Sequence, residues 1–152
     1  MPVVIVEERP DTADASALVG ELEAHLEPIY AQKSRHGYSV EKLLREGVAF
    51  FVARVDGAPA GCGGVQLFGT DYGELKRMYV RPGFRGKGVG KQILEHLADY
   101  SRRHGVNLLR LETGIYQLEA IRLYERFGFR RIAPFGSYVE DPVSRCYEKS
   151  LA

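Results

Sequence analysis

The sequence predicts a mixed α/β (α+β) fold, with helices on both faces of a mostly antiparallel sheet that contains one central parallel βαβ unit. Two observations carry this prediction. The middle of the chain reads as strand, glycine-rich loop, long helix and strand, which indicates a parallel pair of strands with a right-handed crossover. Around it lie short apolar runs joined by turn signals such as Asp56-Gly57, which favour antiparallel hairpins.

The strands follow from runs of apolar residues that are bounded by turn residues. The Asp56-Gly57 pair and the Asp71-Tyr72-Gly73 triplet each separate two such runs, so we expect hairpins there. Seven runs are expected as strands: residues 3–6, 48–53, 60–68, 74–80, 107–112, 129–132 and 145–149.

The helices follow from apolar residues at helical spacing between capping residues. Side-chain oxygens of Ser, Thr and Asp cap helix N-termini, and glycine commonly ends a helix. Four helices are expected: from Thr12 or Asp14 to Ile29, from Ser39 to Arg45, from the glycine-rich loop to Gly105, and over residues 117–127 before Gly128.

The composition is that of an ordinary globular domain. The chain has 152 residues, of which 45% are hydrophobic and 27% charged, so we expect a single domain over residues 1–152 with its own core. The net charge of +1 argues against nucleic acid as a partner, and no apolar run reaches the roughly 18 residues of a membrane span. Two distant cysteines suggest neither a disulfide framework nor a zinc site, so a cytoplasmic location is expected.

The segment Arg85-Gly86-Lys87-Gly88-Val89-Gly90-Lys91 is the clearest functional signal. A glycine-rich turn that enters a helix presents backbone N–H groups without partners, and the helix dipole adds positive potential, so phosphate oxygens are natural ligands. A P-loop would need Ser or Thr in place of Gln92, and a Rossmann fingerprint would need glycine at Lys91 or Ile93. The segment therefore predicts a polyanion site of another type.

Three motifs in order resemble the GCN5-related N-acetyltransferase (GNAT) superfamily. The loop fits Gln/Arg-x-x-Gly-x-Gly/Ala, Met78-Tyr79-Val80-Arg81-Pro82 resembles the fourth strand and its exit, and residues 120–129 (AIRLYERFGF) are similar to the signature A-x-x-L-Y-x-x-x-G-F. The likeness spans roughly residues 74–132 and is weaker outside them. It implies a GNAT-like sheet that is splayed at the cofactor site, and an enzyme that uses acetyl-CoA as co-substrate and no metal.

The resemblance also implies roles for individual residues. Main-chain amides from Arg85 through Lys91 would bind the diphosphate of acetyl-CoA, and the backbone of Met78-Tyr79-Val80 would pair with the pantetheine and the thioester. Gln117 stands where many relatives have an asparagine that contacts CoA. Tyr124 matches a tyrosine that protonates the departing thiolate, although a tyrosine on an amphipathic helix can instead be a core aromatic.

The acceptor amine must lose a proton before it attacks, so a carboxylate is needed as the base. Glu74 is the first candidate, since some family members place a base at this distance before the loop, and Glu112 is the second. Either could instead be a structural carboxylate that pairs with Lys76 or Arg110. No covalent intermediate is implied, so we expect direct attack in a ternary complex, with a backbone N–H near Val80 stabilising the oxyanion.

The acceptor is the least constrained part of the prediction. In similar proteins, an irregular segment after the first helix forms part of the acceptor cleft, and its candidates here are Tyr30, Arg35 and His36. Together with Arg77 they would suit an acceptor that carries a carboxylate, but a polar surface loop is the alternative. Residues 135–138 belong to a long loop that could close over the acceptor.

A small-molecule primary amine is the expected acceptor. Two other functions stay open, a catalytically silent acyl-CoA-binding regulatory module and a protein lysine or N-terminal acetyltransferase. A homodimer is open by analogy with relatives.

Overall fold

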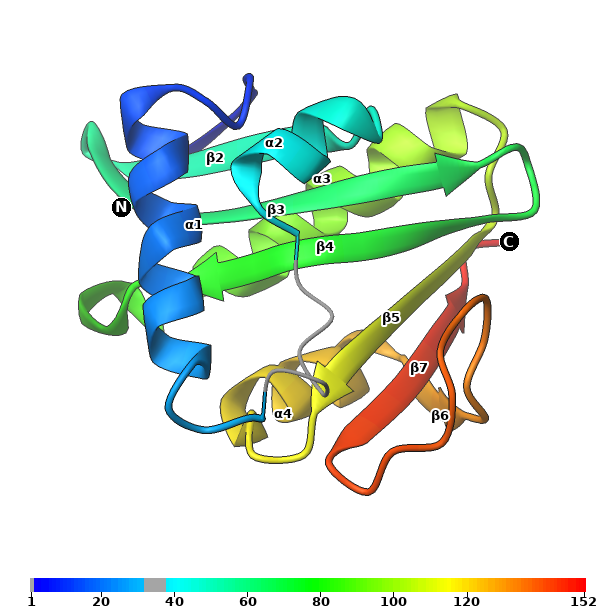
Figure 1. Ribbon diagram of the computed structural model, residues 1–152. Coiled ribbons are helices and arrows are strands. Elements are labelled where there is room, and N and C mark those ends of the chain that lie inside the picture. Colours follow the sequence, from blue (N-terminus) through cyan, green and yellow to red (C-terminus); the bar gives the residue numbers. More distant parts are fainter. Residues whose placement is uncertain (1, 32–37) are drawn as a thin grey trace.

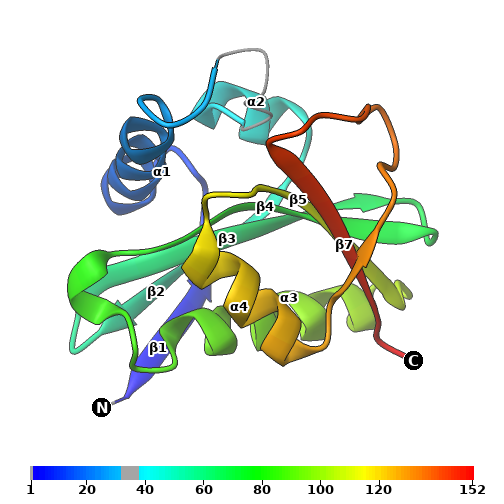
Figure 2. The ribbon, with the colours of Figure 1, turned by 90° about the horizontal axis from the view of Figure 1, so that it is seen from below.

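The computed structural model describes residues 2–31 and 38–152. It shows a seven-stranded sheet with helices on both faces (Figure 1). Helices α1 (Ala13–Leu26) and α2 (Val40–Arg45) cover one face, and α3 (Val89–Arg103) and α4 (Leu118–Phe127) cover the other (Figure 2). The expected mixed α/β class is confirmed.

The strands lie in the order β1-β2-β3-β4-β5-β7-β6, and every neighbouring pair except β4–β5 is antiparallel. The unit β4–α3–β5 is therefore the parallel βαβ unit that the sequence predicted. The strands are Val3–Glu7 (β1), Ala49–Val55 (β2), Ala58–Phe68 (β3), Tyr72–Val80 (β4), Leu108–Gly114 (β5), Arg130–Ile132 (β6) and Ser144–Ser150 (β7).

Strands β4 and β5 are paired over a short stretch and then diverge (Figure 1). Close to this divergence β4 carries a bulge, in which Arg77 and Met78 together face Gly63 of β3. Arg77 has a φ of 54°, an uncommon value for a residue with a side chain, and bulges bend the strand that carries them. The splay expected from the family resemblance is present. The paired positions are Gly73 with Leu109 and Glu74 with Arg110.

Two apolar cores hold the helices on the sheet. The larger lies between the sheet and α3 and α4, and it includes the fully buried Ile93 and Leu97. The smaller joins α1 and α2 to the other face through Leu18, Leu43 and Phe50. Because burial of apolar area is the main driving force of folding, these cores fix the sheet around the opening between β4 and β5.

The capping residues set the helix limits as expected, with one exception. Side-chain oxygens of Thr12 and Ser39 cap α1 and α2. The extension of the first helix to Ile29 is wrong, because α1 ends at Leu26 and Ile29 is 40% exposed. Pro28 explains the difference, since proline has no amide hydrogen to donate to the carbonyl four residues before it.

Strand β4 begins at Tyr72, two residues before the expected start. The turn lies earlier, where Gly69 has a φ of 58° and the amide of Asp71 donates to the carbonyl of Phe68 at 3.1 Å. Tyr72 and Phe68 are cross-strand partners whose rings stack with 4.8 Å between centroids. This aromatic pair stabilises the start of the hairpin.

Within the described ranges, no helix combines the length and the apolar character that a membrane crossing needs. The same residues contain no group of three or more His, Cys, Asp or Glu side chains that could hold a metal ion. Cys62 and Cys146 are both buried free thiols.

Candidate active site

The glycine-rich loop leads from the short 3-10 turn η2 (Pro82–Phe84) into α3. Gly86 and Gly88 have φ values of 76° and 80°, which residues with a Cβ rarely adopt. A Cβ added at either position would meet nothing within 4 Å. These glycines are therefore required by the backbone conformation, and they leave the loop surface open.

The amides at the start of α3 are available to a ligand. The first bond inside this helix runs from the amide of Gln92 to the carbonyl of Gly88 (3.1 Å), so the amides of residues 88–91 have no acceptor in the helix. Gly88 is the N-cap and has no side chain to accept from them. Among the described residues, no backbone carbonyl accepts from the amides of residues 86–88 outside α3. This arrangement fits a phosphate group.

Arg85 attaches the loop to the opening of the sheet. Its Nε donates to the carbonyl of Val80 at the end of β4 (2.9 Å), and its Nη1 lies 3.6 Å from Glu119 Oε2 on α4. Lys87 and Lys91 are exposed beside it. Positive charge thus surrounds the free amides, which favours an anionic ligand.

The end of β4 is paired on one side only. Tyr79 pairs with Cys62 and Val80 with Gly61 of β3, whereas the pairing with β5 ends at Glu74. The backbone of β4 beyond Glu74 therefore forms an edge inside the sheet, next to the glycine-rich loop. An extended ligand that carries amide groups can pair with such an edge.

A cleft of about 130 Å³ lies at this opening. Strands β4 and β5, helices α1 and α4 and three connecting segments contribute to its walls. The structure therefore brings together part of the set of site residues that the sequence predicted. Six residues predicted from the sequence line the cleft: Tyr30, Arg77, Met78, Glu112, Gln117 and Tyr124.

Tyr124 belongs both to the core and to the cleft wall. It is 5% exposed, and its ring packs edge-on against Phe129 with 5.8 Å between centroids. Burial raises the pKa of its hydroxyl, and the charge of Glu112 raises it further. The phenol is therefore protonated at neutral pH, as a proton donor must be.

Glu112 lies on β5 and lines the cleft. The hydroxyl of Ser144 donates to its Oε2 at 2.6 Å, which holds the carboxylate in one orientation. The pKa of Tyr30 is raised mainly by burial, and the charge of Glu112 contributes to this shift as it does at Tyr124. The carboxylate thus lies near both tyrosines.

Glu74 is in a different environment. It lies on β4, is 4% exposed, and is not one of the described residues that line the cleft. Its Oε2 accepts two hydrogen bonds, from Lys76 Nζ at 2.7 Å and from Tyr138 Oη at 2.5 Å. The pairing with Lys76 that the sequence left open is therefore present, as a buried ion pair.

Tyr30 is a buried part of the cleft wall. The amide of Tyr116 donates to its hydroxyl at 2.9 Å, and the two rings lie 5.7 Å apart. Its position after α1 agrees with the expected acceptor side of the cleft. Arg35 and His36, the other two candidates from this segment, lie outside the described residues.

Arg77 lines the cleft but is held by protein groups. Its Nε donates to the carbonyl of Tyr38 (2.7 Å) and its Nη2 to Glu23 Oε2 on α1 (2.7 Å). The sequence did not indicate that Glu23 or Lys76 would line the cleft. No local motif marks Glu23, because its partner Arg77 lies 54 residues away. The spacing of Lys76 from Glu74 indicated an ion pair but not a place in the cleft wall.

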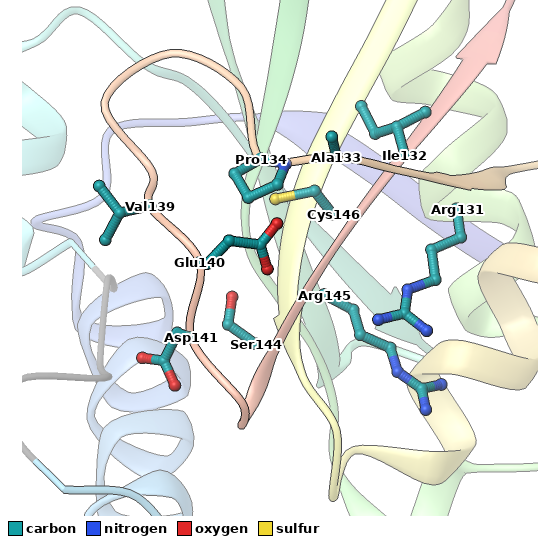
Figure 3. Close-up of a pocket in the computed structure, with 10 residues that line it drawn as sticks. All are labelled: Arg131, Ile132, Ala133, Pro134, Val139, Glu140, Asp141, Ser144, Arg145 and Cys146. Atoms are coloured by element: carbon teal, nitrogen blue, oxygen red, sulfur yellow. The ribbon is translucent and has the colours of Figure 1, made fainter.

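A second cavity, of about 190 Å³, lies between β7 and the connection from β6 to β7 (Figure 3). Arg131 and Arg145 lie together on one side of β7, and the Glu140 carboxylate lies on the other, near Cys146 and Ser144 (Figure 3). None of the residues predicted from the motifs lines it. The cleft between β4 and β5 is therefore the candidate active site.

Known proteins resemble this chain over nearly its whole length. Residues 15–129 match the model of the acetyltransferase (GNAT) family. IAA acetyltransferase of Azospirillum brasilense is 39% identical over 150 residues, which cover 98% of each chain. A crystal structure from Klebsiella pneumoniae is 32% identical, covers 99% of this chain and 98% of its own, and has a TM-score of 0.84.

A structure of PaiA N-acetyltransferase from Thermoplasma acidophilum in complex with coenzyme A shares the fold, with a TM-score of 0.76 at 20% identity over 99% of both chains. The family match covers most of the chain, and it includes the glycine-rich loop, the splayed strands and Tyr124. The chain therefore belongs to the acetyltransferase (GNAT) family.

Proposed function

We propose that the protein transfers an acetyl group from acetyl-CoA to a primary amine of a small molecule, by direct attack in a ternary complex. One observation carries this proposal: the free amides of the glycine-rich loop and the cleft with Tyr124 and Glu112 lie at the same opening between β4 and β5. Arg85 connects the two, since it contacts Val80 and Glu119.

The residues present fit acetyl-CoA. The amides of residues 86–91 would hold the diphosphate, with Lys87 and Lys91 adding positive charge. The edge of β4 at Met78-Tyr79-Val80, which β5 does not cover, would pair with the pantetheine, next to the Val80 carbonyl that already accepts from Arg85 Nε. Gln117 in the cleft wall would contribute an amide side chain. The bound co-substrate would supply the thioester. The fold neighbour in complex with coenzyme A supports this assignment.

Glu112 is our proposed base. It lines the cleft and its orientation is held by Ser144 (2.6 Å), so it can accept a proton from an amine that enters there. Glu74 is the second candidate. Glu74 does not line the cleft, and its Oε2 already accepts from Lys76 and Tyr138, so Glu112 is the better candidate.

Tyr124 is our proposed acid. Its pKa is raised above the ordinary value by burial, so its hydroxyl carries a proton over the whole physiological pH range. It lies in the cleft wall, where it can give this proton to the thiolate that leaves when the amine attacks.

A compact acceptor fits the cleft better than a protein segment. The volume is about 130 Å³, and tyrosine rings and leucines form much of its wall. The Azospirillum brasilense relative is named for IAA and not for a protein acceptor. We therefore place small-molecule amines before protein lysines and N-termini.

The test is thiol release from acetyl-CoA across a panel of primary amines, with CoA binding measured by calorimetry. Tyr124→Phe should lower kcat by about 10²- to 10⁴-fold and leave CoA affinity unchanged. A protein that binds CoA but turns over no amine would instead support a silent binding module. Absence of CoA binding would refute both functions.

A further inference from the structure

We propose that Tyr138 determines acceptor specificity, and that the buried pair Glu74–Lys76 holds it, together with Tyr38, as a roof over the acceptor cleft. The role in specificity rests on the proposed function, because the acceptor is the amine substrate. The roof itself is a property of the folded protein and can be tested without any substrate.

The ion pair Glu74–Lys76 is the anchor of this roof. The Lys76 side chain is 7% exposed and that of Glu74 is 6% exposed, with 2.7 Å between Nζ and Oε2. A buried ion pair needs further hydrogen bonds to offset the loss of water around both charges. Tyr138 supplies one of them, since its hydroxyl donates to Glu74 Oε2 at 2.5 Å.

Tyr38 also contacts this ion pair. Lys76 Nζ lies 4.0 Å from the centre of the Tyr38 ring, within the range of a cation–π interaction. The Tyr38 hydroxyl donates to Gln66 Oε1 at 3.1 Å, and Gln66 is the cross-strand partner of Glu74. Two tyrosines from separate connecting segments thus converge on one pair of charges in β4, and both line the cleft.

The turn that carries Tyr138 is itself held down on the sheet. The Tyr138 amide donates to the carbonyl of Phe135 at 3.0 Å. Phe135 is buried, with its ring 5.2 Å from that of Tyr138 and 5.7 Å from that of Tyr72. The next residue, Val139, is 74% exposed and is not one of the described residues that line the cleft. Tyr138 is therefore the inward-facing residue of this turn.

The ring and the hydroxyl of Tyr138 have separable roles. The ring occupies volume in the cleft wall and so limits the size of an acceptor, whereas the hydroxyl ties the turn to Glu74. Tyr138→Phe removes the tie and keeps the ring, and Tyr138→Ala removes both. Val139→Ala changes the same turn outside the cleft and is the matched control.

The roof is tested by the reaction of Lys76 with sulfo-NHS-acetate, followed by mass spectrometry without acetyl-CoA. The rate at Lys76 is divided by the rate at the exposed Lys87 in the same protein. We expect Tyr138→Phe to raise this ratio at least fivefold and Val139→Ala to leave it unchanged. An unchanged ratio in Tyr138→Phe overturns the roof, whether or not the protein binds CoA.

Specificity is tested with two primary amines that differ in ring size, benzylamine and 1-naphthylmethylamine. We expect Tyr138→Ala to raise the rate of thiol release with the larger amine, relative to the smaller, at least fivefold over the wild type and over Val139→Ala. The ratio of two rates from one preparation cancels any loss of folded protein. No gain with the larger amine overturns the size role of Tyr138, whereas a failure of the proposed function would show as no thiol release from the wild type with any amine.

Discussion

The glycine-rich loop and the acceptor cleft share one opening of the sheet but are built in opposite ways. The loop presents backbone amides from consecutive residues, 86–91, on an open surface, whereas the amide of Arg85, which the sequence also assigned to the diphosphate, donates to the carbonyl of Pro82 at 3.3 Å. The cleft presents side chains from distant segments, and two cations in its wall, Arg77 and Lys76, are already paired within the protein, with Glu23 and Glu74. A ligand common to a family can thus be bound by the backbone, while the ligand that differs between members is met by side chains.

The first prediction tests whether the general base lies in the cleft. Glu112→Gln should lower kcat by about 10²- to 10⁴-fold, the range for loss of a general base, with CoA affinity unchanged. Steady-state thiol release with the best amine of the panel measures it. Glu140→Gln, at an exposed carboxylate near β7, should have no effect. If Glu74→Gln lowers kcat to this extent and Glu112→Gln does not, the base is Glu74.

The second prediction concerns the internal pairing of charges in the cleft. Lys76→Met leaves the Glu74 carboxylate buried without its cation, so it should destabilise the protein by about 3–5 kcal/mol. Glu74→Gln combined with Lys76→Met should recover much of this loss. Urea unfolding measures both. In the exposed pair of Arg9 with Asp11, Asp11→Asn should leave stability unchanged, and an equal loss there would remove the distinction between buried and exposed pairs.

The third prediction concerns the open backbone of the loop. Gly88→Glu forces a side chain onto a residue with a φ of 80° and places a carboxylate at the helix N-terminus, where it competes with the diphosphate. CoA affinity should fall by about 100-fold, as measured by calorimetry. The control is Gly69→Glu, because Gly69 has a comparable φ of 58° but lies in the β3–β4 turn. This variant should leave CoA affinity unchanged. Equal losses in both variants would indicate backbone strain and not phosphate binding.

The fourth prediction is an absence of effect. Burial raises the pKa of Cys62 to about 12 and that of Cys146 to about 11. Because a raised pKa keeps the thiol protonated below it, and only the thiolate reacts, the native protein should not react with Ellman's reagent at pH 8. The unfolded chain should release two equivalents. Rapid loss of activity on thiol modification would point to an acyl-cysteine intermediate and contradict direct transfer.

The difference between the two regions also explains what the sequence could predict. The loop is a run of consecutive residues, and its closely spaced glycines can be recognised in the sequence, so its place at the start of α3 was predictable. The contact between Tyr138 and Glu74 joins positions 64 apart, and that between Arg77 and Glu23 joins positions 54 apart. No local spacing relates such pairs, because they form only when the sheet and its connections have folded.

Secondary structure shows the same limit on a smaller scale. Strands and helices followed from hydrophobic spacing because the spacing decides which side chains face a core. The end of α1 could not be predicted in this way, since the apolar pattern continues through Ile29 whereas the helix ends at Leu26, before Pro28. Where the apolar pattern continues past a proline, the missing amide hydrogen of the proline sets the end of the helix.

The short pairing of β4 with β5 has a thermodynamic consequence. Strands β1–β4 and β5–β7 are joined by only two paired positions between β4 and β5 among the described residues. A molecule bound at this junction would contact both halves of the sheet and hold them together. A ligand that binds only the folded state adds about 2.7 kcal/mol of stability at 100 times its Kd. Acetyl-CoA bound there would therefore make the protein more resistant to unfolding, and to proteolysis of the unfolded chain, in addition to its proposed role as co-substrate.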